Sequence, residues 1–277
     1  MPHLRLLPLA LGLLLLAAGC SAPGPYPHNP AVSDARGTPR DSTTFYFANS
    51  DTLPPDYIPR DKRPPVYLVD GRVMDCKYSL VSASNHLVYF RAPILSNYYL
   101  GQDLYRFLWM RSFHRPVLLT LRRSSNGVTL RTQLLSRPPD RHGDVQPDVT
   151  VDSVRVREEA KHKIIRQHST PAEWRAYLAQ EALYRRPATH IRAEETTRTL
   201  GFAQWQQFEK LLATASFQKM PACKPITMLD GAEWLLEAHR ASGYHAVLRQ
   251  SPDSTDAFRA ACEYLLDLSS AKNEERY

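Results

Sequence analysis

Apolar residues alternate with polar ones in several parts of the chain that follow residue 65, a spacing typical of half-buried strands. Two of these parts have a tight-turn sequence at their centre. Pro116–Ser136 turns at Ser125-Asn126-Gly127, and Leu229–Gln250 turns at Arg240–Gly243. Both segments are therefore predicted to form antiparallel hairpins.

The register of the Leu229–Gln250 hairpin follows from its turn. If His239 lies opposite Tyr244, the partners further along are Leu236 with Val247 and Trp234 with Arg249. One face then carries Trp234, Leu236, Ala238, His245, Val247 and Arg249. The other face carries Glu233, Leu235, Glu237, His239, Tyr244, Ala246, Leu248 and Gln250.

A weaker alternation begins the ordered part of the chain. Val66–Val69 is typical of a strand that turns at Asp70-Gly71 and returns over Arg72–Tyr78. Asn85–Arg91 is interpreted as a further strand. Leu100–Phe113 fits both a helical and an alternating period, and a helix that becomes extended chain near its end is favoured.

Three segments carry apolar residues at helical spacing. The first begins with Thr170-Pro171-Ala172-Glu173, a capping box with proline in the first turn, and runs to about Tyr184. It is expected to bury Trp174, Tyr177 and Leu178. The second covers Phe202–Ser216, and the third covers Thr255–Leu268 with Ser254 as its N-cap. The apolar stripes are Phe202, Trp205, Phe208, Leu212 and Ala215, then Phe258, Ala261, Cys262, Leu265 and Leu268.

The order of these elements is hairpin, insertion, helix, hairpin, helix. It predicts an α+β domain with an antiparallel sheet built from hairpins and with helices packed on one face. This single domain is placed at 66–270, and the polar tail 271–277 is expected to fray. Residues 137–168 are expected to form a loop or insertion, in which Val151–His168 adds a strand or two.

The first twenty residues form a separate block. An apolar run, Leu6–Leu16, follows Arg5 and is shorter than the ~20 residues of a spanning helix. The block ends in Ala17-Ala18-Gly19-Cys20, so the layout predicts a signal peptide over 1–19. It resembles the bacterial lipoprotein class, in which the cysteine is lipidated and becomes the first mature residue, although Leu is usual where this chain has Ala17. The alternative is an ordinary cleaved signal.

A stretch rich in proline and polar residues, 20–65, follows the signal. It has few aliphatic residues and predicts a semi-extended tether between the lipid and the domain. Phe45, Tyr46 and Phe47 are the residues expected to dock on the domain. Ser21-Ala22 lacks the Asp that retains lipoproteins at the inner membrane, so the resemblance favours the outer membrane over the inner one.

The net charge indicates which kinds of molecule the chain could contact, and the cysteines indicate which disulfide it could form. The net charge is +7, or about +6 once Arg5 leaves with the signal, and it is spread along the chain. Such a spread is typical of a solvated surface and favours contact with anionic lipid or polysaccharide. No nucleic-acid-binding motif is present. Of the 4 cysteines, Cys76 and Cys223 are the expected disulfide pair, and Cys262 is expected to be buried.

His239, Tyr244, His245 and Arg249 form the densest polar cluster in the sequence. A functional interpretation makes His245 a general base and Arg249 an anion clamp. The predicted register instead points His239 and His245 to opposite faces. A structural role is therefore favoured, with Arg249 packed on Trp234 as a cation–π pair.

Acidic residues offer no better centre for catalysis. Asp230 precedes a glycine, which is typical of a turn. Glu233 and Glu237 share a strand face without a second acidic pair, which leaves glycosidase chemistry unsupported.

Motifs of zinc proteases, EF-hands, serine hydrolases and nucleotide-binding loops are absent from the sequence. His162, His168 and His190 have no metal-ligand spacing. Trp174 and Trp205 are interpreted as core residues rather than as a ligand groove. The sequence thus predicts no catalytic, cofactor or metal site, and Cys20 as the single modified residue.

Several short runs mark the C-terminal half. They are Tyr105-Arg106-Phe107-Leu108-Trp109, Asp230-Gly231-Ala232-x-Trp234-x-Leu236-Glu237, Tyr244-His245, Arg249, Ser251-Pro252, Cys262 and Leu265-Leu266. Through them this half resembles a set of uncharacterised bacterial secreted proteins that has no established activity. Gln250 departs from the set, which tends to have Trp there. The resemblance implies a domain boundary and transfers no catalytic residue.

Together these patterns predict a noncatalytic, lipid-anchored cell-envelope protein that binds or scaffolds an envelope protein partner and needs no cofactor. Two alternatives stay open. One is an envelope hydrolase whose site cannot be grouped by sequence. The other is an accessory lipoprotein that docks to an outer-membrane transporter, since Val66–Gly71 resembles a six-residue run in the plug domains of such transporters, although a hairpin explains that run better.

Overall fold

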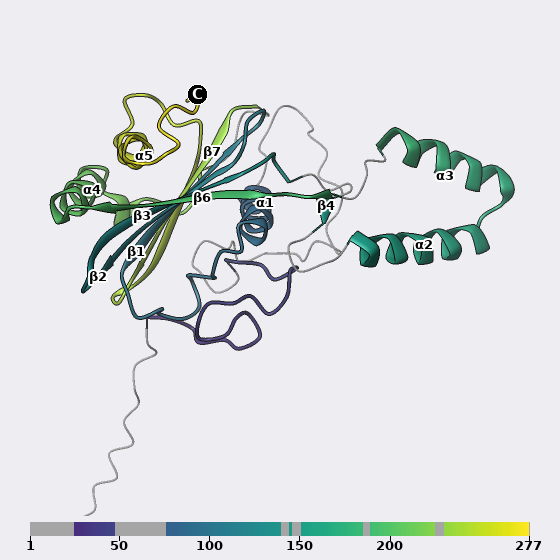
Figure 1. Cartoon of the computed structure of the whole chain (residues 1–277), viewed down its shortest axis with the longest axis horizontal. Helices are drawn as coiled ribbons and strands as arrows, with labels where there is room; N and C mark the ends of the chain where they lie inside the picture. Colours follow the sequence, from purple (N-terminus) through teal and green to yellow (C-terminus); the bar gives the residue numbers. More distant parts are fainter. Residues whose placement is uncertain are drawn as a thin grey trace, which may run out of the picture.

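The structure is a computed structural model that describes residues 25–47, 76–139, 144–145, 151–184, 189–224 and 230–276. The signal peptide, Cys20 and the strand expected at Val66–Val69 lie outside these ranges. The described chain forms one large sheet with helices on both faces and a separate pair of helices (Figure 1).

Six antiparallel strands build the sheet. They are β1 (Leu104–Arg111), β2 (Val117–Ser124), β3 (Gly127–Leu135), β6 (Ala193–Leu200), β7 (Ala232–Arg240) and β8 (Gly243–Gln250), in the spatial order β6-β3-β2-β1-β7-β8. Two short strands, β4 (Asp144–Val145) and β5 (Thr189–His190), pair in parallel elsewhere. The predicted α+β class with an antiparallel sheet is confirmed.

Both clear hairpins are confirmed. The β2–β3 hairpin closes at the pair Ser124 and Gly127, and Gly127 has φ +124°, a conformation that glycine adopts without strain. The β7–β8 hairpin has the predicted register, with the pairs His239–Tyr244, Leu236–Val247 and Trp234–Arg249.

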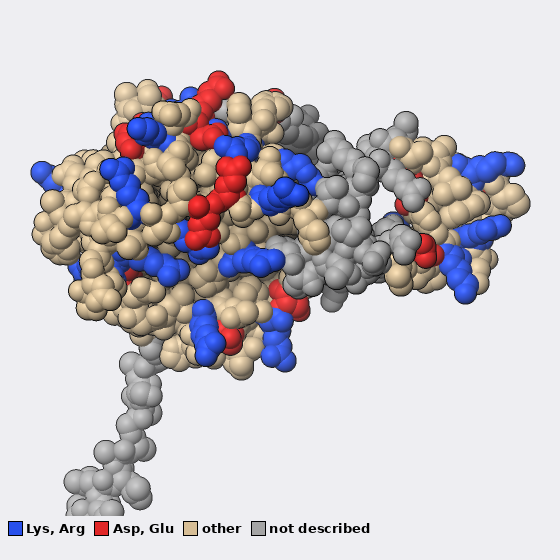
Figure 2. Space-filling view, viewed as in Figure 1, with Lys and Arg blue, Asp and Glu red and all other residues tan. Residues whose placement is uncertain are grey.

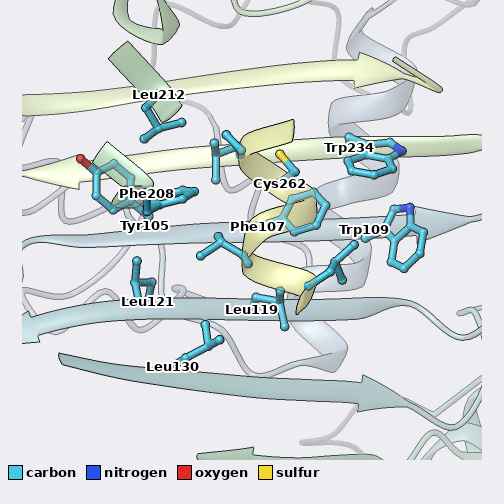
Figure 3. Close-up of a cluster of buried hydrophobic side chains, with 14 of the residues drawn as sticks. Tyr105, Phe107, Trp109, Leu119, Leu121, Leu130, Phe208, Leu212, Trp234 and Cys262 are labelled. Atoms are coloured by element: carbon cyan, nitrogen blue, oxygen red, sulfur yellow. The ribbon is translucent and has the colours of Figure 1, made fainter. Parts of the chain in front are cut away.

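Helices α4 (Phe202–Thr214) and α5 (Ala257–Leu268) cover one face of the sheet, as expected (Figure 1). Figure 3 shows α5 lying across the strands with Cys262 beside Phe107. The core of this face includes Tyr105, Phe107, Trp109, Leu119, Leu121, Leu130, Trp205, Phe208, Leu212, Trp234, Phe258, Cys262 and Leu265. Phe202 was expected in this stripe but is 54% exposed, because α4 starts directly after the end of β6.

The opposite face is covered by α1 (Cys76–Tyr89) and by residues 25–47, so helices pack on both faces rather than on one as expected. Tyr46 and Phe47 are fully buried there, as predicted, and Tyr26 is buried with its hydroxyl donating to the Arg240 carbonyl at 2.8 Å. A tether is therefore wrong for 25–47, because its aromatic side chains supply the buried apolar area that the aliphatic count did not reveal. Residues 48–65 lie outside the described ranges.

Helix α1 replaces the strands expected over 76–78 and Asn85–Arg91. Its buried residues Leu80, Ala83, Leu87 and Val88 recur at helical spacing against the sheet. Small polar side chains between them, such as buried Ser84, concealed this period in the sequence. A disulfide between Cys76 and Cys223, the pair predicted, fastens the start of α1.

Strand β1 replaces the helix favoured over Leu100–Phe113. All eight of its residues are buried, because β1 lies between β2 and β7 with both sheet faces covered. A strand buried on both faces shows no alternation, so periodicity could not identify it.

Helices α2 (Val151–Gln167) and α3 (Pro171–Tyr184) form a helical hairpin that stands apart from the sheet (Figure 1). The strands expected over Val151–His168 are wrong, since Arg, Glu, Lys and Gln outweigh the β-branched residues there. The predicted capping box of α3 is confirmed, with Thr170 N–H donating to Glu173 at 2.8 Å.

The closing part of the chain differs in two details from the prediction. Asp256, rather than Ser254, caps α5 by accepting the Phe258 N–H at 2.8 Å. The tail packs back on the domain instead of fraying, because Ala271 is buried and Glu274 pairs with Arg111 at 2.6 Å.

Candidate functional site

His239 belongs to the interior of the face covered by α1. Its Nδ1 donates to the Leu95 carbonyl at 2.8 Å, and the Leu100 N–H donates to Nε2 at 2.9 Å. Burial lowers the pKa of His239, so its ring stays neutral near pH 7. With both ring nitrogens engaged by backbone groups, His239 holds the 95–100 segment against β7.

His245 and Arg249 lie on the other face, as the register predicted. His245 Nε2 is 3.0 Å from the Phe217 carbonyl. Arg249 donates to the carbonyls of Leu248 at 2.7 Å and Pro221 at 2.9 Å, and burial lowers the pKa of its guanidinium. These two side chains fasten the segment after α4 to β8, so the structure does not bring the polar cluster together as one site.

The predicted cation–π pair between Arg249 and Trp234 is wrong. The guanidinium over the Trp234 ring is that of Arg259, 5.4 Å from the ring centroid. Arg249 is opposite Trp234 in the backbone register, but its side chain turns toward the carbonyl of Pro221 instead.

Acidic side chains of β7 serve internal contacts. Glu233 accepts a hydrogen bond from the Ser79 hydroxyl of α1, and burial raises the pKa of this carboxyl group. Asp230 is exposed at the entry to β7, beside Gly231 with φ +120°, as its interpretation as a turn residue requires.

Sequence reasoning missed a buried charged network centred on Glu237. Its carboxylate pairs with Arg106 of β1 through hydrogen bonds of 2.5 and 2.8 Å, and it accepts the Tyr244 hydroxyl at 2.8 Å. Arg106 also donates to the Pro93 carbonyl at 2.5 Å. The signal available was an arginine inside a run of large apolar residues. The network joins β1, β7, β8 and the segment that follows α1.

Histidines outside the domain core make no metal centre. His162 lies 2.7 Å from Glu181 across the α2–α3 hairpin, and His168 Nδ1 donates to the Ile164 carbonyl at 2.9 Å. His190 is exposed in β5. Within the described ranges, no three His, Cys, Asp or Glu side chains converge as a metal site.

Trp174 and Trp205 do not share a groove. Trp205 is fully buried in the core beneath α4, as predicted. Trp174 stacks on Tyr177 in the α2–α3 hairpin, with 5.5 Å between ring centroids. The sequence expectation that α3 buries its apolar residues in the core is wrong, because Trp174 and Tyr177 are only half-buried and Leu178 is 38% exposed.

Comparison with protein-family models, curated proteins and solved structures gives no match. None of the helices in the described ranges is long and apolar enough to cross a bilayer.

A surface groove of about 810 Å³ lies at the sheet end where β1 begins and β2 turns into β3. Asp103 organises its polar part. It accepts hydrogen bonds from the Tyr99 hydroxyl at 3.2 Å and the Ala241 N–H at 3.0 Å, and it faces Arg123 at 3.6 Å and Arg240 at 3.7 Å. Glu209 also lies 3.0 Å from Arg240, so two carboxylates balance the two guanidinium groups and the groove offers a polar surface rather than a poised acid–base pair.

The α2–α3 hairpin carries three large apolar side chains that are exposed to solvent. Val156 and Ile164 of α2 are 61% and 59% exposed, and Leu178 of α3 is 38% exposed. Val156, Ala160 and Ile164 follow one another at a spacing of four, which places them on one stripe of α2. In Figure 2, uncharged surface separates the basic residues on the outer edge of this hairpin. Such a surface is typical of a contact with a partner.

Proposed function

We propose that this chain is a lipid-anchored cell-envelope protein that binds or scaffolds another envelope protein without catalysing a reaction. The α2–α3 hairpin carries this proposal, because it presents Val156, Ile164 and Leu178 to solvent on an element that stands apart from the sheet. Isolated exposed apolar residues are common, but three of them on a protruding pair of helices favour a partner surface.

Two further observations support the compartment and the absence of catalysis. The Cys76–Cys223 disulfide is the kind of bond that persists in oxidising compartments and is rare in the cytosol. The polar residues that sequence suggested as catalytic, His245 and Arg249 among them, are instead engaged by backbone carbonyls. Lipidation at Cys20 would then hold the domain at the membrane surface.

Replacing Cys20 by Ser is expected to move the protein from the membrane fraction to the soluble fraction of the envelope. The reason is that the lipid on this cysteine would be the principal membrane attachment. The measurement is fractionation of cells that express each form, together with incorporation of labelled palmitate. Equal membrane retention of both forms, or a native form found in the cytosol, would contradict the anchor.

Ile164→Glu is expected to reduce cross-linking to an envelope partner at least tenfold, because a charge placed in the centre of an apolar contact costs more than 1.4 kcal/mol. The free energy of unfolding should change by less than about 0.5 kcal/mol, since the side chain is exposed. The measurement is in-cell cross-linking of the lipidated protein followed by identification of the captured protein.

Phe113→Glu is the matched control for this experiment. Phe113 is an apolar residue that is 75% exposed between β1 and β2, outside the α2–α3 hairpin. It should leave the captured partner unchanged. If Ile164→Glu and Phe113→Glu capture the partner equally well, the hairpin is not part of the interface. Binding of both variants to lipid vesicles is measured in parallel. If Ile164→Glu loses vesicle binding but keeps protein capture, the hairpin contacts the membrane instead of a protein.

A further inference from the structure

Strand β6 is an open edge of the large sheet. It pairs with β3 on one side (Figure 1), and none of the described residues pairs with it on the other. All of its residues except Leu200 are exposed, whereas those of the central strand β1 are all buried. Neither proline nor a bulge interrupts β6, and these are devices that protect many sheet edges. The edge therefore offers an uninterrupted position for a further strand.

The pairing with β3 fixes which backbone groups of β6 point to this open edge. Just before β6, the Ser136 N–H donates to the Arg192 carbonyl at 2.8 Å, so these two residues form a hydrogen-bonded pair of the ladder. Hydrogen-bonded and non-hydrogen-bonded pairs alternate along antiparallel strands. The N–H and C=O groups of the even-numbered residues of β6 therefore point to β3. Those of the odd-numbered residues point to the open edge, and these are Ala193, Glu195, Thr197 and Thr199.

The amino-acid sequence of β6 favours a strand without burial. Thr196, Thr197 and Thr199 are β-branched, which raises the preference for extended backbone. The exposed side chains of β6 lie on both faces of the sheet, since successive residues of a strand point to opposite faces. A further strand at this edge would therefore add cross-strand contacts on both faces.

Charges in β6 are arranged symmetrically about Thr196. Glu194 precedes it by two positions and Arg198 follows it by two, so these side chains share the sheet face that α4 and α5 cover. Glu194 is 69% exposed at its side chain and is joined to Arg115 by one contact of 3.2 Å. Arg198 donates to the Leu268 carbonyl at 3.2 Å, and no carboxylate of the described chain lies within ion-pair distance of it. A strand with the opposite order of charges would complement both residues.

A second copy of β6 can pair with this edge when it runs antiparallel. The outward backbone groups of the two copies then meet only if odd-numbered residues lie opposite odd-numbered ones, because such pairs exchange both of their hydrogen bonds. This condition places the two-fold axis at a residue rather than between two residues. The backbone therefore allows an axis at any single position of β6, and the charges distinguish among these positions.

The charges favour an axis at Thr196. In that register Glu194 of each copy lies opposite Arg198 of the other, and the two Thr196 residues face each other. An axis at Glu195 or Arg198 would place like charges opposite each other. An axis at Thr197 would leave Glu194 and Arg198 without a charged partner. The register centred on Thr196 is thus the complementary one.

We propose that β6 pairs antiparallel with β6 of a second copy of this chain, with the two-fold axis at Thr196. The pairing would join two six-stranded sheets into one continuous sheet. Glu195 of each copy would exchange hydrogen bonds with Thr197 of the other, and Ala193 with Thr199. The proposal depends neither on the lipid anchor nor on the α2–α3 hairpin as a partner surface.

Thr196→Cys tests the register through a disulfide. The two residues would form a non-hydrogen-bonded pair with Cα atoms about 4.5 Å apart, which a disulfide can bridge. Thr197→Cys is the matched control, because its two copies would lie about 8 Å apart, beyond disulfide reach. The full chain is expressed in cells, mildly oxidised and separated by electrophoresis without reductant. Thr196→Cys should give about tenfold more linked dimer than Thr197→Cys. The parent chain, which retains Cys20, gives the background.

Exchange of the charges tests the pairing of Glu194 with Arg198. Glu194→Arg and Arg198→Glu each place like charges opposite each other twice in the symmetric dimer, so each should raise its dissociation constant about tenfold. The double variant Glu194→Arg/Arg198→Glu restores opposite charges and should return the constant to within about threefold of the parent. Sedimentation of the detergent-solubilised full chain over a concentration series measures the constant. The unfolding midpoints should stay close to that of the parent, since both side chains are exposed.

Any of the following results would overturn the proposal. A chain that stays monomeric over the whole concentration series excludes the second copy. Equal linking by Thr196→Cys and Thr197→Cys excludes the register. A double charge variant that dimerises as weakly as the single variants excludes the pairing of Glu194 with Arg198. A disulfide from Thr196→Cys to a different envelope protein, in place of a second copy, assigns the edge to that protein.

Discussion

Replacing both Cys76 and Cys223 by Ser should lower the free energy of unfolding by about 4 kcal/mol. The disulfide closes a loop with a sequence separation of 147, and its removal allows the unfolded chain far more conformations. It also releases the start of α1 from the segment beside β8, where the Leu248 N–H donates to the Ala222 carbonyl at 2.7 Å. Equilibrium denaturation in urea measures the change.

Reductant supplies the control for this experiment. The parent protein in reductant should match the double variant, whereas reductant should not change the variant. Cys262 remains in both forms and is buried in the core, where burial raises the pKa of its thiol and keeps it unreactive. A loss below about 1 kcal/mol would mean that α1 packs equally well without the bond.

Breaking the buried ion pair should have a comparable effect. Arg106→Met or Glu237→Gln alone is expected to cost about 3–5 kcal/mol, because each leaves a buried group without its charged partner. Both side chains are almost completely shielded from solvent, and they are joined by hydrogen bonds of 2.5 and 2.8 Å. Thermal and urea unfolding of the single variants measure the loss.

The double variant Arg106→Met/Glu237→Gln should be more stable than the sum of the single losses predicts, since it removes both charges together. Arg276→Ala is the surface control. Its partner Asp267 is 61% exposed at its side chain, so this pair should contribute less than about 1 kcal/mol. A double variant that loses the sum of the single effects would show that Arg106 and Glu237 do not act as a pair.

The hairpins were predictable because their signals are local. In β2–β3 and β7–β8 a two-residue turn fixes the register, and alternation then assigns every side chain to a face. His239 and His245 were placed on opposite faces for this reason alone. The strand β1 carried no such signal, since its identity depends on pairing with β2 and β7, which lie at different distances along the chain.

Helices were predicted where a cap or an apolar stripe marked them. α3 and α4 met that condition, whereas α1 buries small polar residues such as Ser79 and Ser84 that a hydropathy pattern counts as exposed. Strands are expected over Val151–His168, a segment that includes Val156 and Ile164. These two residues are instead exposed on a helix, which makes them candidates for contact rather than for the core.

The candidate sites could not be predicted from spacing. Arg106 and Glu237 are far apart in sequence, and they become a buried ion pair because β1 lies beside β7. Arg249 was assigned the correct strand position, but the sequence could not reveal that the segment after α4 would bring the Pro221 carbonyl to it. Both of these side-chain contacts form between segments that are far apart in the sequence, so local spacing does not reveal them.

If the chain is lipidated at Cys20 as proposed, the burial of Tyr26 limits the distance between the domain and the bilayer. Tyr26 is six positions after Cys20 in the sequence, and a fully extended chain over that separation reaches only about 20 Å. Tyr26 is hydrogen-bonded to Arg240 at the β7–β8 turn. In a chain lipidated at Cys20, this turn would therefore lie close to the lipid headgroups. A binding partner would then have to reach the domain close to the membrane surface, because the short linker would allow it little movement away from the bilayer.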